Sequence, residues 1–279
     1  MATHYRDPER GVRVAFFGGE LPSPELLAAA GGAPISLRVR PDALEPEQLP
    51  ALLAAGVDHI ELDALTLDDH ALRDLGRRYT GSRVLAMAKG LRSRGLQVGA
   101  VLSPGLPRTS HDTAVRDAEQ LAPHLHTARV HPALVIAGSR LEQRFLERLY
   151  TPLTLGEAVT ACVSVLDRLE DAGVEVIRVG LQPKVDGYGR AVAGPLHSSL
   201  RELAEGRRVL VKLRALLANV PAGSAVILSC SPRDRSRTRG PLGQHLRSLR
   251  ADLGLSDLVL REDASLARGS WQHEVMGVG

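Results

Sequence analysis

The stretch VRVAFFGGELP, residues 12–22, sets a pattern that the rest of the chain repeats. Its apolar run, Val12–Phe17, is typical of a buried strand, and two glycines stand where that strand ends. Glycines at such a place let a ligand approach the backbone closely, and the carboxylate of Glu20 can accept hydrogen bonds from an amino group. A tight turn with an exposed Glu20 explains the same residues, because a single Gly-Gly-Glu is a weak signal.

Short apolar runs and longer helical patterns alternate along the first 180 residues. The runs that indicate strands are Val12–Phe17, Ile35–Val39, His59–Leu62, Gln97–Leu102, Ala128–His131 and Val174–Gly180. The amphipathic segments between them are Pro24–Ala30, Glu45–Ala55, Asp69–Arg78, Ser82–Arg94, Asp112–Leu121, Ser139–Arg148 and Leu155–Ala172. This order predicts an α/β fold with a parallel sheet, either open or an incomplete barrel, whose ligands bind at the carboxyl ends of the strands.

The pattern changes after Pro195. A long helix over Ser198–Leu217 is followed by a strand at Val226–Ser229, a helix at Leu242–Leu253 and a strand at Leu258–Leu260. We therefore expect a partial barrel over residues 1–192 and a small C-terminal α/β extension over residues 193–279.

Composition excludes several classes of protein. Two cysteines, Cys162 and Cys230, cannot form a disulfide framework, and they are too few for a structural zinc or an iron–sulfur cluster. Residues 1–11 are polar and no apolar stretch reaches 18 residues, so we expect a cytoplasmic protein with no membrane span. The net charge of +3 is too small to indicate nucleic acid by itself.

Several motifs in order resemble the radical S-adenosylmethionine (SAM) superfamily. They are Gly18-Gly19-Glu20, Arg40-Pro41-Asp42, Gly56–Leu62, Gly76–Thr80, Pro104–Pro107, Arg129–Pro132, Tyr150–Leu153, Ile177–Gln182 and Gly194–His197. The downstream motifs are similar to the branch that holds Elongator-catalytic-subunit-like and coproporphyrinogen-oxidase-like proteins. The resemblance implies a partial (β/α) barrel, a [4Fe–4S] cluster held by a CxxxCxxC loop, and reductive cleavage of SAM. In this branch it also implies that the reaction can modify an RNA base. The SAM contacts that it implies are Gly18, Gly19, Glu20, Arg77, Gly105, Leu106 and Pro107.

This sequence departs from the family pattern at the cluster. No CxxxCxxC occurs in the chain, and only 17 residues precede Gly18, so we expect the first βα unit of the barrel to be missing. Leu65 stands where the relatives have glutamine, Arg108 where they have glycine, and His131 where they have tyrosine. These departures predict a truncated or degenerate member that holds no [4Fe–4S] cluster in this chain. The alternative is a non-catalytic protein that uses the barrel and the basic extension to hold a nucleotide, an RNA or a partner subunit.

Other features leave two interpretations open. Glu61 and Asp63 alternate along one strand, so both point the same way, either into a barrel or simply at the strand's exit. The four arginines in Arg233–Gly240 can bind RNA phosphates or belong to a solvated loop. The stretch has no aromatic residue nearby on which an RNA base could stack, which makes RNA binding less favoured. The histidines between His111 and His131 are more simply a solvated loop than a metal site.

A missing first unit also predicts an open sheet edge at Val12–Phe17. We expect that edge to be exposed or covered by a helix, the N-terminal arm or a partner chain, and not by a complete extra strand from this chain.

Overall fold

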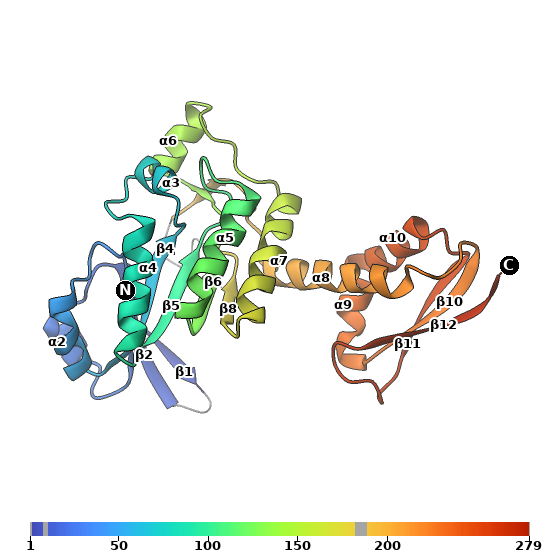
Figure 1. Ribbon diagram of the computed structural model, residues 1–279, viewed down its shortest axis with the longest axis horizontal. Coiled ribbons are helices and arrows are strands. Elements are labelled where there is room, and N and C mark those ends of the chain that lie inside the picture. Colours follow the sequence, from blue (N-terminus) through green and yellow to red (C-terminus); the bar gives the residue numbers. More distant parts are fainter. Residues whose placement is uncertain (1, 8–10, 182–188, 279) are drawn as a thin grey trace. The chain divides into compact units, whose positions relative to one another are not determined.

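The computed structural model describes residues 2–7, 11–181 and 189–278 (Figure 1). The chain divides into two compact units, Met1–Ser198 and Ser199–Gly279, and each is described by itself. The division lies a few residues after the boundary near residue 192 that the sequence indicates.

Unit 1 is built on a seven-stranded sheet in the order β1-β2-β3-β4-β5-β6-β8. The strands are β1 (Ala2–Asp7), β2 (Gly11–Gly19), β3 (Ile35–Val39), β4 (Val57–Leu65), β5 (Gln97–Leu102), β6 (Thr127–Val130) and β8 (Glu175–Val179). All neighbours from β2 to β8 pair in parallel, and these six strands curl into a half-barrel. The α/β class and the partial parallel barrel expected from the sequence are therefore confirmed.

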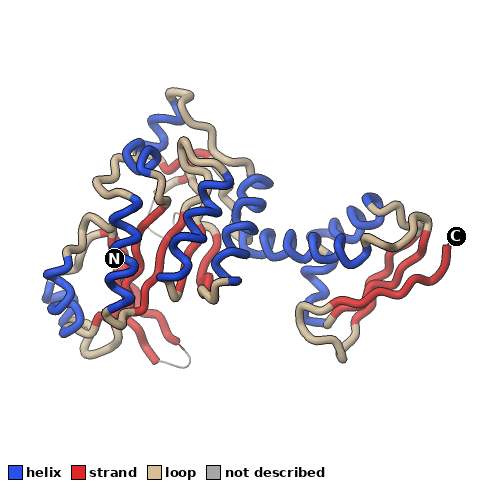
Figure 2. The backbone as a smooth tube through the Cα atoms, viewed as in Figure 1, coloured by secondary structure: helices blue, strands red, loops and turns tan. Residues whose placement is uncertain are grey.

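The helices of unit 1 connect these strands. They are α1 (Pro24–Ala28), α2 (Leu49–Ala54), α3 (Asp69–Asp74), α4 (Gly81–Ser93), α5 (His111–Leu121), α6 (Arg140–Leu146) and α7 (Leu155–Asp171), with 3-10 turns η1 (Pro46–Gln48) and η2 (Ala122–His124). Hydroxyl or carboxylate N-caps start all of these α-helices except α2, as where Thr154 accepts from Glu157 N at the start of α7. Helices α4, α5 and α7 contact β4, β5, β6 and β8 and cover one face of the sheet (Figure 2).

The helix-covered face and the inner face of the sheet use alternate residues of the same strands. The side chains on the helix-covered face are apolar and fully buried, namely Leu37, Val39, Ile60, Leu62, Val98, Ala100, Ala128 and Val130. The residues between them are polar on β3, β4 and β6, namely Ser36, Arg38, His59, Glu61, Asp63, Thr127 and Arg129, and His131 continues this row just beyond β6, whereas β5 contributes Gly99 and Val101. The apolar half of the alternation forms the core, which leaves the inner face polar.

The first edge of the half-barrel carries strand β1. It pairs antiparallel with β2 from Ala2 opposite Phe16 to Asp7 opposite Gly11. The N-terminal arm, one of the coverings expected, thus lies on this edge. It does so as a complete strand, so the expectation that this chain would add no further strand there was wrong. The reason is local: β1 and β2 lie close together in the sequence, and their antiparallel pairing uses the backbone groups that β2 would otherwise leave free at this edge.

A small ladder lies beyond the main sheet. Strand β7 (Val135–Ile136) pairs antiparallel with β9 (Ala191–Ala193). The sequence analysis did not name either strand, because two or three residues carry no readable periodicity.

Unit 2 is a three-stranded sheet with helices on one side. Its elements are α8 (Leu200–Leu217), β10 (Ser224–Cys230), η3 (Pro232–Asp234), α9 (Arg235–Arg239), η4 (Pro241–Gly243), α10 (Gln244–Asp252), β11 (Asp257–Glu262) and β12 (Trp271–Val278). Strand β10 lies between β11, which is parallel to it, and β12, which is antiparallel. A core of leucines and valines from α8, α10, β10 and β11 joins the helices to the sheet. The predicted small α/β extension is confirmed, with β12 as an element that the sequence analysis missed.

Gly206 in the middle of α8 has a packing role. A Cβ at this position would lie 3.0 Å from Cε1 of His245, which is buried against the helix. Glycine in a helix interior costs about 1 kcal/mol relative to alanine, and here it admits the imidazole ring.

Candidate functional site

The carboxyl end of β2 carries Gly18, Gly19 and Glu20. No atom lies within 4 Å of a Cβ built on Gly18, so the backbone there faces open space. Gly19 has φ +79°, a conformation that favours glycine, and its carbonyl accepts a hydrogen bond of 2.8 Å from the backbone N–H of Arg40. The Glu20 carboxylate is 65% exposed and forms an ion pair of 2.5 Å with the Arg40 guanidinium. This loop is accessible to a ligand, although its carboxylate already has a partner.

The loop after β5 is held much more firmly. Leu106 and Pro107 are buried, and Leu106 packs in a cluster with Ala133, Val135, Leu141 and Tyr150. The Tyr150 hydroxyl donates a hydrogen bond of 2.7 Å to the carbonyl of Gly105. Gly105 has φ +84°, and a Cβ there would lie 2.6 Å from Leu153. Of the three residues that the resemblance implies here, Gly105 is the least buried, but its carbonyl and its Cα already contact Tyr150 and Leu153.

Arg77 lies just after α3 and faces the same end of the sheet. One of its terminal nitrogens lies 3.9 Å from Asp63, and its buried Nε has no hydrogen-bond partner within residues 2–7, 11–181 and 189–278. Asp63 also accepts a hydrogen bond of 2.9 Å from Arg38. The structure therefore brings Arg77 next to the inner face, in the neighbourhood of the Glu61–Asp63 pair.

The inner face holds a buried ion-pair network. Glu61 is 2% exposed and accepts a hydrogen bond of 2.6 Å from Nε of Arg129, while Nε of Arg38 lies 3.5 Å from its other oxygen. The Arg129 guanidinium also lies 5.8 Å from the centre of the Phe17 ring, within range of a cation–π contact. Glu61 and Asp63 therefore point inward, which settles the two interpretations of that pair.

Sequence reasoning missed the arginines of this network. Arg38 alternates with Leu37 and Val39, and Arg129 alternates with Ala128 and Val130, as Glu61 does with its apolar neighbours. The same period of two that exposed Glu61 and Asp63 was thus available for both arginines.

A second polar layer lies nearer the amino ends of the strands. Nδ1 of His59 lies 2.6 Å from the Ser36 hydroxyl, and its Nε2 lies 3.1 Å from the Thr127 hydroxyl. Burial lowers the pKa of His59. Both ring nitrogens are therefore used within this layer.

His131 occupies a different environment on the same face. Its side chain is 5% exposed, and Nε2 has no hydrogen-bond partner among the residues that the structure describes. Burial, together with the positive charges of Arg38, Arg129 and Arg178, holds the pKa of this imidazole well below 6.5. His131 is thus a neutral, buried ring with an unused nitrogen.

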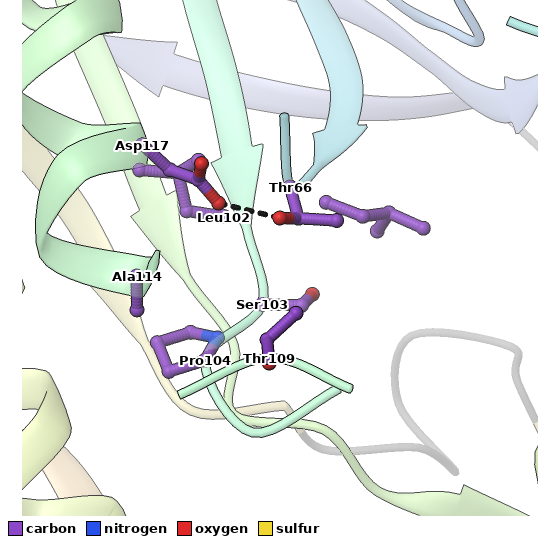
Figure 3. A pocket seen from close by; sticks show the side chains of 8 residues that line it. Thr66, Leu102, Ser103, Pro104, Thr109, Ala114 and Asp117 are labelled. Atoms are coloured by element: carbon purple, nitrogen blue, oxygen red, sulfur yellow. Dashed lines mark hydrogen bonds between the residues drawn. The ribbon is translucent and has the colours of Figure 1, made fainter. Parts of the chain in front are cut away.

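Leu65 and Thr66 end β4 beside a small cavity (Figure 3). The Thr66 hydroxyl donates a hydrogen bond of 2.5 Å to the buried carboxylate of Asp117, and burial raises the pKa of that carboxyl. The cavity, about 10 Å³, is also lined by Leu102, Ser103 and Pro104 and is too small for an organic ligand. Leu65 has φ +63° and packs against the cluster that holds Leu106.

The two cysteines lie on separate elements in the two units. Cys162 is fully buried on α7, where burial raises the pKa of its thiol to about 12. Cys230 is buried at the end of β10 in unit 2. An iron–sulfur cluster usually takes three or four thiolates from one neighbourhood, so the cysteines present do not fit it. The described ranges contain no group of three or more His, Cys, Asp or Glu side chains placed to hold a metal ion.

Within the described ranges no helix is both long and apolar enough to cross a bilayer. This finding concerns helices alone.

Comparisons with known proteins place the chain in a family. The Radical SAM superfamily model matches residues 4–121, and the Radical_SAM C-terminal domain model matches residues 125–210. A curated relative, tRNA uridine(34) acetyltransferase of Dehalococcoides mccartyi (strain CBDB1), is 25% identical over 179 residues, which cover 62% of this chain and 38% of that protein.

Two solved structures have a similar arrangement. Elp3 of Methanocaldococcus infernus with an N-terminal deletion superposes with a TM-score of 0.54 at 20% identity, over 64% of this chain and 42% of that one. Coproporphyrinogen III oxidase (HemN) of Escherichia coli gives a TM-score of 0.44 at 16% identity, over 53% and 36% of the two chains.

The chain spans less than half the length of the curated relative and of Elp3. The two family models match consecutive segments that together cover well over half of the chain, and the similarity extends to an Elongator-type relative, as the motifs indicated. The chain therefore belongs to the radical SAM superfamily.

Proposed function

We propose that this chain binds SAM at the carboxyl end of the half-barrel but holds no [4Fe–4S] cluster with its own residues, so that it does not cleave SAM by itself. The observation that carries the second half is the position of the cysteines. Cys162 is buried on α7 and Cys230 is buried at the end of β10 in unit 2, so the two thiols do not stand together in one loop as cluster ligands do.

The accessible backbone at Gly18 supports the first half of the proposal. SAM, when bound, supplies a methionyl amine and carboxylate, a sulfonium and an adenosyl group. One carboxylate oxygen of Glu20 can accept a hydrogen bond from the amine while the other stays paired with the Arg40 guanidinium. Arg77 offers a buried Nε–H without a partner to an acceptor on the ligand. Gly105 and the buried Leu106 and Pro107 form a fixed wall in the loop that follows β5.

Calorimetric titration with SAM tests this assignment. Glu20→Gln removes the charge but little volume, and we expect about tenfold weaker binding, because a hydrogen bond to a charged group contributes about 1.5–3 kcal/mol. Glu47→Gln, an exposed position on η1 with no ion pair, is the matched control and should bind like the wild type. Absence of SAM binding by the wild type would overturn the proposal and favour the non-catalytic alternative.

Anaerobic reconstitution with iron and sulfide tests the cluster separately. We expect no broad [4Fe–4S] absorption from this chain alone. A stoichiometric cluster that survives gel filtration would show that other side chains supply its ligands.

A second candidate, RNA binding, is favoured by the charges of unit 2. Residues 199–279 hold 13 Lys and Arg against 8 Asp and Glu. Arg233 and Arg239 are exposed and Arg237 is half-buried, and none of the three has a carboxylate partner among the described residues. Arg235, by contrast, is paired with Glu262 at 2.6 Å. The curated relative's name refers to a tRNA, which makes tRNA the natural probe.

Fluorescence anisotropy with tRNA at several salt concentrations tests this candidate. Replacing Arg233, Arg237 and Arg239 by glutamine should weaken binding and lower its salt dependence, since each lost phosphate contact releases fewer counterions. Replacing Arg73, Arg94 and Arg168 of unit 1 by glutamine removes the same charge and should change binding little. Equal losses in both variants would mean that net charge alone governs the interaction.

A further inference from the structure

The loop between α9 and α10 presents one apolar side chain to solvent on an unusual backbone. Leu242 is 92% exposed, more than any other large apolar side chain among the described residues. Its φ of +50° and ψ of +24° lie in the left-handed region, where the Cβ of an ordinary residue crowds the backbone. Neither burial nor backbone preference therefore accounts for a leucine at this position.

The rest of unit 2 holds this loop in place. Arg247 donates a hydrogen bond of 2.6 Å from Nη1 to the carbonyl of Leu242. A Cβ on Gly240 would lie 2.4 Å from the ring of His245, so the loop backbone packs directly on this buried imidazole. Nδ1 of His245 in turn lies 2.9 Å from the carbonyl oxygen of Arg237. Residues whose backbone is kept in a rare conformation by their surroundings are concentrated at binding sites, and the fixed presentation of Leu242 fits that pattern.

Two guanidiniums lie beside the exposed leucine. A Cβ on Gly243, the next residue, would lie 3.3 Å from a terminal nitrogen of Arg247 and 3.7 Å from Nε of Arg239. Both arginines are exposed, and neither forms an ion pair with a carboxylate in the part of the chain that the structure describes. The leucine therefore stands between two cationic groups that face solvent.

The nearest carboxylates in the sequence are held by other groups. Asp234 accepts a hydrogen bond of 2.6 Å from the backbone N–H of Gly269, and Asp252 is paired with Arg214. The positive charge beside Leu242 is thus not cancelled by either of them.

A protruding apolar side chain between two guanidiniums fits an unstacked base and its phosphates. Leucine is one of the side chains that proteins insert against bases, whereas it is under-represented among the residues that dominate protein–protein interfaces. Membrane binding grows with the apolar area inserted, and one leucine offers little. Bases lie open in single strands and loops of RNA, while in an RNA duplex they are stacked and their edges are hard to reach.

We propose that Leu242 packs against an unstacked base of a single-stranded RNA segment, with the guanidiniums of Arg239 and Arg247 on the flanking phosphates. Guanidinium groups suit phosphates because their planar N–H donors match two oxygens at once. The proposal rests on RNA binding by unit 2, the second candidate above, and adds the side chain that contacts the base and the form of RNA that is bound. It also answers the lack of stacking aromatics, since Leu242 supplies the apolar surface.

Fluorescence anisotropy of the wild-type chain with a labelled, unstructured RNA and with a duplex of the same sequence tests the proposal. Leu242→Asn is the informative variant, because asparagine adopts the left-handed conformation more readily than leucine but removes the apolar surface. We expect it to weaken binding of the single strand about tenfold and to change binding of the duplex little. Its thermal unfolding midpoint should equal or exceed that of the wild type, which a merely structural role of Leu242 would not allow.

Salt dependence separates the leucine from the arginines. Leu242→Asn removes no phosphate contact and should leave the dependence of affinity on salt unchanged, whereas Arg239→Gln should lower it. Leu53→Gln on α2 of unit 1 replaces another exposed leucine, 44% accessible, and should bind RNA like the wild type.

The possible failures can be told apart. Equal affinity of Leu242→Asn and wild type for the single strand would overturn the base contact while leaving RNA binding by the arginines intact. An equal loss with the duplex would also contradict it. Absence of RNA binding by the wild type would overturn both this proposal and the second candidate. Binding to vesicles of phosphatidylserine and phosphatidylcholine that Leu242→Asn abolishes, without RNA binding, would assign the loop to a membrane surface instead.

Discussion

The two faces of the half-barrel sheet come from alternate residues of the same strands and differ in almost every physical property. On β4, Ile60 and Leu62 are fully buried against the helices, while Glu61 between them is 2% exposed and ion-paired on the inner face. The apolar side is stabilised by removal of surface from water, which needs no particular partner. The polar side is stabilised only where each charge or hydrogen-bonding group has a partner at the right distance. The first face therefore decides the fold, and the second decides what the fold can hold.

Adjacent substitutions on β4 give the largest effects and test whether both faces matter equally. Leu62→Ala should cost about 2–5 kcal/mol of unfolding free energy through lost burial and a cavity. Glu61→Ala should cost about 3–5 kcal/mol, because it removes the buried carboxylate that accepts the hydrogen bond of Arg129 and faces Arg38. Denaturant unfolding of both variants measures these values.

A triple substitution then sharpens the comparison. Replacing Arg38, Glu61 and Arg129 together by apolar residues should recover part of the loss, since buried ion pairs are often no better than well-packed apolar groups. A triple variant less stable than Glu61→Ala would show that the network contributes net stability.

A substitution at Gly99 should have the next largest effect on stability, because this glycine is closely packed on the inner face. A Cβ there would lie 2.6 Å from the Thr127 hydroxyl and 3.1 Å from Nε2 of His59. Gly99→Ala should therefore cost about 1–3 kcal/mol as an overpacked position. In a Thr127→Ala background the hydroxyl is gone and the cost should fall, which a double-mutant cycle measures. Additive costs would mean that the backbone, not this contact, responds to the added methyl group.

The helix-covered face could be predicted in detail from the sequence, and the inner face only in part. Ile35–Val39 and Gln97–Leu102 were predicted with the bounds that the structure has, because an apolar run between Gly-capped helices is a strong local signal. The hydrogen bond between Glu61 and Arg129 joins residues that are 68 positions apart in the sequence, and no local pattern predicts such a contact. Strand β12 was missed because charged and polar residues interrupt Trp271–Val278, so its pairing with β10 is tertiary.

The same division applies to the residues that the family resemblance implies. Gly18, Gly19 and Glu20 lie at an accessible strand end, as a ligand-binding loop requires. Leu106 and Pro107, in contrast, are buried, which their sequence position alone did not indicate. Contact between SAM and these residues stays a prediction, and calorimetric titration of Glu20→Gln with SAM tests it.

The pH dependence of stability should also test the inner face, because its strands carry titratable side chains whose pKa burial lowers. The pKa of His131 lies well below 6.5 in the folded state under the influence of burial and of Arg38, Arg129 and Arg178, while in the unfolded chain it is about 6.5. The unfolded state therefore binds more protons as the pH falls, and folding free energy is lost below about pH 6.5. The slope is at most about 1.4 kcal/mol per pH unit for one histidine.

Unfolding free energies between pH 7.5 and 5.5 measure this slope. His59, whose pKa is also lowered, contributes in the same direction, so His131→Phe should reduce the slope without abolishing it. A slope unchanged by His131→Phe would mean that this imidazole titrates alike in the folded and unfolded chain.

The smallest effect is expected from an ion pair of the same chemistry outside the sheet. Arg168 on α7 and Glu119 on α5 are 2.8 Å apart, yet their side chains are about half exposed, at 51% and 48%. Exposed pairs contribute about 0.2–1 kcal/mol, since water screens the charges and both side chains lose freedom. Arg168→Ala should therefore destabilise the protein by less than about 1 kcal/mol, and 0.5 M salt should remove most of that difference. A loss as large as that of Glu61→Ala would show that the Arg–Glu geometry, and not burial on the inner face, sets the energy of these pairs.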